Sequence, residues 1–227
     1  MSEPSPLAGF TGKARLFPLP NLVFFPQVAQ PLHIFEPRYR EMTADALAGD
    51  RFIAVVLPAP GWEKDYANAP ALHSVACLGR IIAEQKLDDG RFNILLRGLA
   101  RIRVVKEIAS KKFYRIARTE ILHEVPLDDE ALALHWRKTL IDKAAGWFPN
   151  QGELGEQFGK LLHSDLALGV LCDIMTFALP LDAEFKQTLL EQLNVEARLR
   201  VLHDFLEETK AAADQSQRRF PPEFSAN

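Results

Sequence analysis

Four prolines interrupt the apolar stretch LFPLPNLVFFPQVAQPLHIF near the start of the chain, at positions 18, 20, 26 and 31. Because proline has no amide donor and restricts the residue before it, each apolar burst can form only a short strand or a bent edge. After residue 35 the spacing becomes helical, and Pro37 suits a first turn. The apolar face of this helix consists of Tyr39, Met42, Thr43, Ala46 and Leu47. The stretch therefore predicts a pair of short strands followed by one helix, which Gly49 ends.

Apolar runs predict several more strands between residues 51 and 122. The run RFIAVVL at residues 51–57 is continuous, which is typical of a buried central strand. Alternating runs follow at residues 78–87, 91–98, 99–108 and 113–122. Several short strands at this spacing predict a closed or nearly closed barrel.

The dipeptide Asp89-Gly90 indicates a hairpin between the runs at 78–87 and 91–98. It favours a type I′ turn, in which both central residues need φ > 0. In that register Leu87 pairs with Phe92. The apolar face then carries Phe92, Ile94 and Leu96, and the opposite face carries Arg91, Asn93 and Arg97. Gly98 is expected to break the strand after this hairpin.

The chain after Pro126 has helical patterns. Three acidic residues at 128–130 suit a helix N-terminus, and the apolar segment 166–177 suits a helix with neighbours on all sides. Asp182 and Asn194 are placed to cap the last two helices. The polar tail from about Ala211 is expected to be disordered. The sequence therefore predicts a strand-rich domain at residues 12–124 and a helical domain at 126–213.

Composition narrows the class of protein. A chain of 227 residues that is 48% hydrophobic and 25% charged is typical of a soluble globular protein. No apolar run reaches the roughly 20 residues that span a bilayer. The N-terminus MSEPSPLAGF lacks the basic start and apolar core of a secretory signal. Cys77 and Cys172 lie far apart in apolar segments, which predicts two buried thiols in a reducing cytoplasm.

Three groups of residues, in order along the chain, resemble the N-terminal domain of Lon protease, especially the short stand-alone bacterial proteins of that family. They are Leu16-Phe17-Pro18-Leu19 with Ile34-Phe35-Glu36-Pro37-Arg38-Tyr39, Gly79-Arg80-Ile81 with Leu87-Asp88-Asp89-Gly90-Arg91 and Leu96-Arg97-Gly98, and Ala178-Leu179-Pro180-Leu181 with Lys186-Gln187-Thr188-Leu189-Leu190-Glu191. The resemblance spans about Ala14 to Leu206. It implies an α+β fold, in which an N-terminal PUA-like β pseudo-barrel, shared with RNA-modifying enzymes and with cereblon, precedes a C-terminal helical bundle.

The sequence lacks the catalytic motifs of full-length Lon. A phosphate loop needs G-x-x-x-x-G-K-[ST], but residues 155–161 have three residues between the glycines and Leu161 in place of the hydroxyl. The Ser-Lys dyad of Lon belongs to a later domain, which a chain of this length is too short to contain. His73 and Cys77 have no second pair at metal-ligand spacing. We therefore expect no catalytic residues, no cofactor and no metal.

Charge is distributed unevenly along the chain. Residues 80–118 carry 11 Lys+Arg against 4 Asp+Glu, whereas residues 124–210 carry 8 against 16. One explanation is that two domains have solvent-exposed surfaces of different charge. The alternative is that the basic part forms a face that meets an anionic partner. Arg101 and Arg103 alternate with Ile102 and Val104 and are expected at that surface. Trp62 and Tyr66, two aromatic residues in the loop between residues 58 and 70, are further ligand candidates. Packing of this loop against the barrel would also bury them. The candidate ligand-binding residues are Trp62, Tyr66, Arg80, Arg91, Arg97, Arg101 and Arg103.

Three functions fit these features. The resemblance implies non-catalytic recognition of unfolded or degron-bearing polypeptides, with strand edges and apolar grooves receiving an extended peptide. The alternative is an RNA-binding module that uses the basic face. Against it stand a pI of about 6.1 and the lack of interleaved aromatics for base stacking. The third is a self-association scaffold that pairs the basic and acidic halves. No membrane partner is expected, and the sequence does not indicate an oligomeric state.

Overall fold

The computed structural model describes residues 5–64, 69–144, 159–161 and 164–218. The chain forms two compact units and passes between them three times. The first unit contains Met1–Val125 and Asp173–Leu193, and the second contains Pro126–Cys172 and Asn194–Asn227. The sequence-based bounds, 12–124 and 126–213, divide the chain only once. The structure thus adds a helical segment, residues 173–193, to the strand-rich unit.

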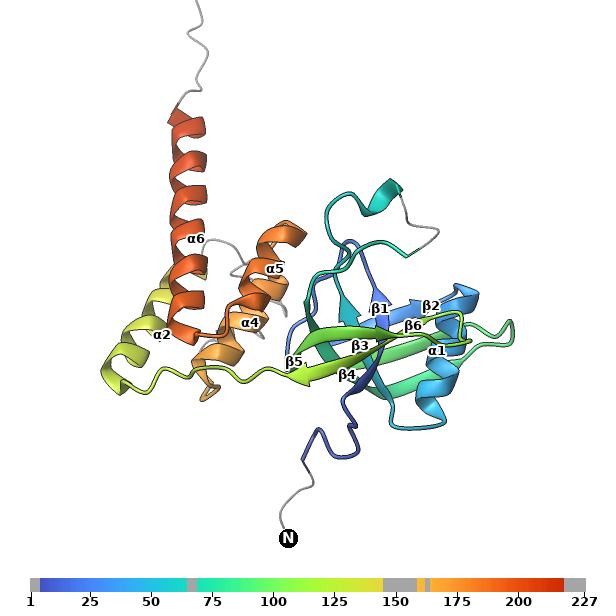
Figure 1. Ribbon diagram of the computed structural model, residues 1–227. Helices are drawn as coiled ribbons and strands as arrows, with labels where there is room; N and C mark the ends of the chain where they lie inside the picture. Colours follow the sequence, from blue (N-terminus) through green and yellow to red (C-terminus); the bar gives the residue numbers. More distant parts are fainter. Residues whose placement is uncertain (1–4, 65–68, 145–158, 162–163, 219–227) are drawn as a thin grey trace, which may run out of the picture. The chain divides into compact units, whose positions relative to one another are not determined.

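Six strands form one mixed sheet in the first unit, in the order β2-β5-β4-β3-β1-β6 (Figure 1). Strand β5 also pairs with β6, so five of the strands, in the order β5-β4-β3-β1-β6, form a closed ring. The proline-rich strands β1 and β2 do not pair with each other, since β1 pairs with β3 and β6. The strands are β1 (Lys13–Pro18), β2 (Ala29–Ile34), β3 (Phe52–Val56), β4 (Val75–Lys86), β5 (Phe92–Ile108) and β6 (Arg115–Ile121).

Strand β3 is buried at each of its five positions and lies between β4 and β1, as its continuous apolar run predicts. One face of the ring of strands packs on a core rich in small side chains. This core contains Ala14, Leu16, Phe52, Ala54, Val56, Ala76, Leu78, Ile102 and Ala117. Short side chains let strands from opposite parts of the ring approach one another closely.

The hairpin between β4 and β5 has a different turn from the predicted one. Gly90 has a φ of 80°, but Asp89 is not among the described residues with positive φ, so the turn is not type I′. The Leu87 amide donates to the Arg91 carbonyl (2.9 Å), which closes a three-residue loop. Phe92 therefore pairs with Lys86, and the predicted register was wrong by one residue. The predicted apolar face is confirmed by the burial of Phe92, Ile94 and Leu96.

The predicted strands at 91–98 and 99–108 form one strand, β5, with an extra residue near its middle. Gly98 and the residue two positions later pair with adjacent residues of β4, so Leu99 is bulged out of the register. One extra residue reverses the alternation of side chains between the two faces of a strand. Arg101 therefore shares a face with the buried Leu96, and Arg97 lies on the other face.

Gly98 allows a second segment to approach the strand. Its amide donates to the Val28 carbonyl (2.8 Å), and its carbonyl accepts from the Gln27 amide (2.9 Å). A Cβ at this position would collide with the Phe25 carbonyl oxygen. The glycine therefore seats the loop before β2 on β5, and the prediction that it ends the strand was wrong.

Helix α1 (Pro37–Leu47) begins where the sequence predicts, with Pro37 in the first turn. Its buried residues, Tyr39, Met42, Thr43 and Ala46, are those of the predicted face. It packs against β1 and β2 (Figure 1). Phe24 and Phe25 lie in the same large core. The proline-interrupted N-terminal stretch thus forms one wall of this core.

Residues 173–193 complete the same core from the C-terminal part of the chain. They contain the end of α4 (Leu168–Ala178) and all of α5 (Ala183–Glu191). Leu190 is buried in the core, and Ile174 and Phe177 pack against it. Gln187 donates through Nε2 to the Val75 carbonyl of β4 (3.0 Å). These contacts attach α5 directly to the sheet.

In the second unit, α2 (Glu130–Ala144) packs against α6 (Val195–Arg218). The Trp136 ring lies edge-on to His203, with centroids 5.9 Å apart.

The predicted caps are confirmed, since Asp182 accepts from the Phe185 amide and Asn194 from the Ala197 amide. Helix α6 continues to Arg218, so the expected disorder from residue 211 does not agree with the structure.

Candidate functional site

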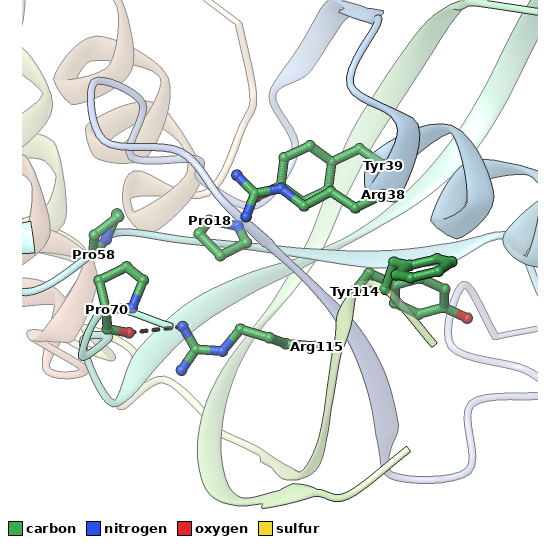
Figure 2. Close-up of a pocket in the computed structure, with 8 residues that line it drawn as sticks. Pro18, Arg38, Tyr39, Pro58, Pro70, Tyr114 and Arg115 are labelled. Carbon is green, nitrogen blue, oxygen red and sulfur yellow. Dashed lines mark hydrogen bonds between the residues drawn. The ribbon is translucent and has the colours of Figure 1, made fainter. Parts of the chain in front are cut away.

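A pocket of about 50 Å³ lies in the first unit, beside the ends of β1 and β3, the start of β6 and the first turn of α1 (Figure 2). One water needs about 10–15 Å³, so the pocket can take a few waters or one aliphatic side chain. It is lined by Pro18, Arg38, Tyr39, Pro58, Pro70, Phe113, Tyr114 and Arg115.

Prolines form much of the apolar wall. Pro18, Pro58 and Pro70 come from separate segments, and all three are buried. A bridge between Pro58 and Leu72 holds the segment that carries Pro70 beside the end of β3. Because proline has a fixed φ and no amide donor, this wall is stiff and apolar. Phe113 is 81% exposed, more than any other large apolar side chain described. The pocket thus combines a rigid wall with an accessible aromatic ring.

Two guanidinium groups complete the lining. Arg115 donates through Nη1 to the Pro70 carbonyl (2.7 Å; Figure 2) and forms an ion pair with Glu107. The Arg38 guanidinium lies 4.6 Å from the centre of the Tyr39 ring, and its Nη2 is 2.9 Å from a carboxylate oxygen of Glu36. Each cation has an acidic neighbour, so the lining offers N–H donors with little net charge. Such a lining suits an apolar group flanked by carbonyl oxygens.

A polar network behind the pocket holds Tyr114 in place. Its hydroxyl donates to Asp45 Oδ2 (2.7 Å), and the Lys112 Nζ lies 2.6 Å from the same oxygen. Burial, and then the hydrogen bond with Asp45, raise the pKa of Tyr114 to about 12. The hydrogen bond from Lys112 is the main reason that the pKa of Asp45 is lowered. The Phe113 amide donates to Glu41 Oε2 (3.2 Å), so helix α1 also fixes the rim.

The residues predicted from sequence do not line this pocket. Trp62 lies half-buried in a 3₁₀ turn, η1 (Trp62–Lys64), and Tyr66 falls outside the described residues. Arg80 stacks its guanidinium over the Phe52 ring at 5.4 Å. Arg91 is exposed at the hairpin tip, where it is paired with Asp89. Arg97 is exposed and donates to Gln27. Arg80 and Arg97 are register partners on β4 and β5, so these two arginines lie side by side, whereas Arg91 lies six residues from Arg97 at the hairpin tip.

Arg101 was expected at the surface, but it is buried, with 2% of its area exposed. Its two terminal nitrogens reach the two carboxylate oxygens of Asp173 at 2.7 and 2.8 Å, and Nη1 also donates to Glu124 (2.7 Å). Its Nε donates to the Leu190 carbonyl (2.8 Å). The expectation failed because the bulge at Leu99 turns Arg101 to the face that residues 173–193 cover. Arg101 is thus a structural residue.

Sequence reasoning missed the residues of the pocket, although one signal was present. Pro18 and Pro58 mark the ends of predicted strands, and Pro70 ends the predicted loop after the second of them. The sequence does not show that these points meet, because their meeting depends on the order of the strands in the sheet. Cys77 and Cys172 are both buried, as predicted. No group of three His, Cys, Asp or Glu residues in the described ranges is placed to hold a metal ion. Within the same ranges, every helix is too short or too polar to span a bilayer.

The fold and the pocket define an α+β domain with a small surface pocket. The chain belongs to the ATP-dependent protease La (LON) substrate-binding domain family, whose sequence model matches residues 13–208. It is 28% identical over 195 residues to Lon protease 2 of Myxococcus xanthus, and these cover 84% of the chain and 23% of that protein. It is also 28% identical over 195 residues to the Lon protease of Anaeromyxobacter dehalogenans, covering 22% of it. The chain thus spans about a quarter of the length of these relatives.

Two solved structures share the fold. The Lon N-terminal domain protein from Xanthomonas campestris has a TM-score of 0.60 and 21% sequence identity, with 84% of this chain and 96% of that chain covered. The N-terminal domain of a Mycobacterium avium complex Lon protease has a TM-score of 0.64 and 18% identity, with 86% and 98% covered. Both alignments cover nearly all of the solved domain and most of this chain, so the chain shares the fold of these domains.

Proposed function

We propose that this protein is a non-catalytic module that recognises unfolded or degron-bearing polypeptides. The observation that carries the proposal is the proline-walled pocket with the exposed Phe113 at its rim. Membership of a substrate-binding domain family supports it. We also propose, from the family, a PUA-like pseudo-barrel for the ring of strands, a helical bundle in the second unit, a cytoplasmic location and a substrate-recognition or adaptor role.

In this proposal one apolar side chain of an extended peptide enters the pocket. The wall of prolines excludes water from it, and the Phe113 ring covers it from the rim. The guanidinium groups of Arg38 and Arg115 donate to carbonyl oxygens on either side of the inserted residue. Because only one side chain is enclosed, affinity per site is modest, and selectivity is for apolar character instead of for a sequence.

Strand addition at β2, the terminal strand of the sheet order, has less support. In an antiparallel pair, every second residue directs its backbone N–H and C=O groups toward the partner strand. The Val28 carbonyl accepts from the Gly98 amide of β5, so Ala29, Pro31 and His33 direct their backbone groups away from β5. Pro31 has no amide to offer a peptide, and Gln30 Nε2 already donates to its carbonyl (3.0 Å). Proline at an outer edge is a common protection against unwanted pairing. We therefore assign recognition to the pocket.

The RNA-binding alternative loses part of its basis. Arg101 is buried, and Arg80 is stacked on Phe52. The bulge at Leu99 places Arg97 and Arg103 on opposite faces of β5. Of the arginines predicted as one basic face, Arg80 and Arg97 lie side by side as register partners, but Arg101 and Arg103 lie on the other face of the sheet. Binding of RNA remains an outcome to be measured.

The pocket can be tested with a fluorescein-labelled unfolded decapeptide of alternating leucine and serine. Fluorescence anisotropy should show Phe113→Ala binding at least fivefold more weakly than the wild type, because the ring that covers the bound side chain is lost. The matched control is Phe35→Ala, since Phe35 is also exposed (61%) but does not line the pocket. Equal affinity of Phe113→Ala and the wild type, or equal losses in both variants, would contradict the pocket.

The absence of catalysis is tested with homogeneous protein. We expect neither ATP hydrolysis nor cleavage of casein, because the sequence contains no phosphate loop and no Lon dyad was found in it. Proteolysis stimulated by ATP would refute the non-catalytic assignment.

A further inference from the structure

Three cations stand side by side across strands β1, β6 and β5. Arg118 of β6 is the register partner of Lys13 of β1 on one side and of Lys106 of β5 on the other. All three side chains are exposed. Neighbouring strands are about 4.8 Å apart, so the Cα atoms of the three residues span roughly 10 Å on one face of the sheet. We call these three residues the cation row.

A second bulge in β5 places Lys106 in this row. Val104 pairs with Thr119 and Lys106 with Arg118, so Val105 is the extra residue. Without it, Lys106 would lie on the face of Val104, which packs against the small-residue core. Bulges often re-aim a side chain. The local backbone thus turns a third cation to the face that already holds two.

The cation row is not neutralised by the protein itself. Within the described residues, none of the three side chains has an ion pair or a side-chain hydrogen bond. Glu120 is the nearest acidic residue along β6, but it faces Arg103 across the ladder. Like charges directly opposite each other in a sheet are destabilising. An anionic partner would remove this repulsion.

A hollow of about 230 Å³ adjoins the row on the side of Lys13. Its lining includes Arg15, Asp50, Tyr114 and Ile116. Arg15 and Asp50 are paired there at 2.6 Å, so Lys13 is the cation left to a ligand. The row therefore has room beside it for the backbone of a bound segment.

We propose that the cation row binds an acidic segment of a polypeptide, with successive carboxylates opposite Lys13, Arg118 and Lys106. The polypeptide nature of the partner rests on the proposed function, and its acidity rests on the row. Single-stranded nucleic acid fits less well, because it stacks its bases on aromatic rings. The exposed large aromatic side chains of the described residues are Phe35 and Phe113, and neither belongs to β1, β5 or β6. The protein would thus select apolar segments that carry acidic residues nearby.

The test uses the full chain and two labelled probes, an acidic decapeptide of alternating glutamate and serine and a decauridylate. Anisotropy should show that Lys13→Ser/Lys106→Ser/Arg118→Ser binds the acidic peptide at least tenfold more weakly. The dependence of binding on salt should also become shallower. The control, Lys86→Ser/Lys138→Ser/Lys160→Ser, removes the same charge from exposed positions elsewhere and should lose less than twofold.

Equal losses in the two triple variants, or none in the first, would overturn the proposal. Tighter binding of decauridylate than of the peptide, lost in the first variant, would assign the row to nucleic acid instead. The leucine–serine peptide separates the two inferences. If Phe113→Ala binds it like the wild type while the row variant loses the acidic peptide, the pocket fails and the cation row stands.

Discussion

Two cations of strand β5 share a face but have opposite environments. Arg101 is buried and held by Asp173, Glu124 and the Leu190 carbonyl. Lys106 lies five residues further along, exposed and beside two other cations. The difference comes from what covers the strand, because residues 173–193 pack over the first position. A bulge thus decides the face on which a side chain lies, whereas a segment distant in sequence decides whether that side chain is buried.

The largest expected effect is at Arg101. Arg101→Met leaves the buried carboxylate of Asp173 without its counter-charge, which should lower the free energy of unfolding by about 3–5 kcal/mol. Urea denaturation measures this. The double variant Arg101→Met/Asp173→Leu removes both charges and should recover most of the loss. A single variant within about 1 kcal/mol of the wild type would show that the pair is not buried.

A smaller effect is expected at the bulge that turns Arg101 inward. Gly98→Ala places a Cβ against the Phe25 carbonyl, and the loop that donates to and accepts from Gly98 must shift. We expect a loss of about 1–3 kcal/mol by thermal denaturation. The control is Gly159→Ala, where nothing lies within 4 Å of the added Cβ. This change should be neutral or slightly stabilising, and a similar loss at both glycines would contradict the close approach.

The third prediction concerns pH. The hydrogen bond from Lys112 lowers the pKa of Asp45 below the ordinary 3.8. A carboxyl group whose pKa is lower in the folded state than in the unfolded state stabilises the fold. This contribution is complete at pH values above the unfolded-state pKa, and it is lost as the pH falls through the folded-state pKa. Asp45→Asn should therefore be less stable than the wild type at pH 7, and this difference should shrink below about pH 4. Urea titrations from pH 7 to pH 2 test this, and a difference independent of pH would contradict it.

The smallest effect is expected in the cation row, and its sign is unusual. Arg118→Thr removes the central charge from between Lys13 and Lys106, so it should stabilise the protein slightly, by less than about 1 kcal/mol. Arg103→Thr removes a cation that faces Glu120 and should destabilise by a similarly small amount. Urea denaturation at low salt measures both. A loss of stability in Arg118→Thr would mean that the row is already neutralised.

The sequence predicted those parts of the fold that depend on local patterns. Helix α1, the buried strand β3 and the caps Asp182 and Asn194 are where the pattern predicts them. The errors lie where register matters. Asp89-Gly90 suits two kinds of turn, and no local pattern marks Leu99 as a bulged residue. Because the prediction had no bulge there, it placed Arg101 on the exposed face of the strand.

The candidate site was less predictable than the fold. Its prolines were visible as the ends of strands or of a loop, but the order β3-β1-β6 that brings them together depends on pairings between distant residues. The cation row depends on register in the same way, since Lys13 and Arg118 are far apart in sequence and adjacent in space. Trp62 and the basic residues suit a ligand by their chemical type, but the sequence pattern does not determine where they lie. Type without position does not identify a site.

The three crossings of the chain between its units have a consequence for synthesis. Arg101 is made 72 residues before Asp173, and the intervening stretch includes the first segment of the second unit. At about 5–20 residues per second, translation of that interval takes roughly 4–14 s. During this time the strands lack the helices that cover their large core, and Arg101 lacks its partner. A nascent chain that ends before Leu193 would therefore present an uncovered apolar face to chaperones, in a protein that we propose itself binds unfolded polypeptides.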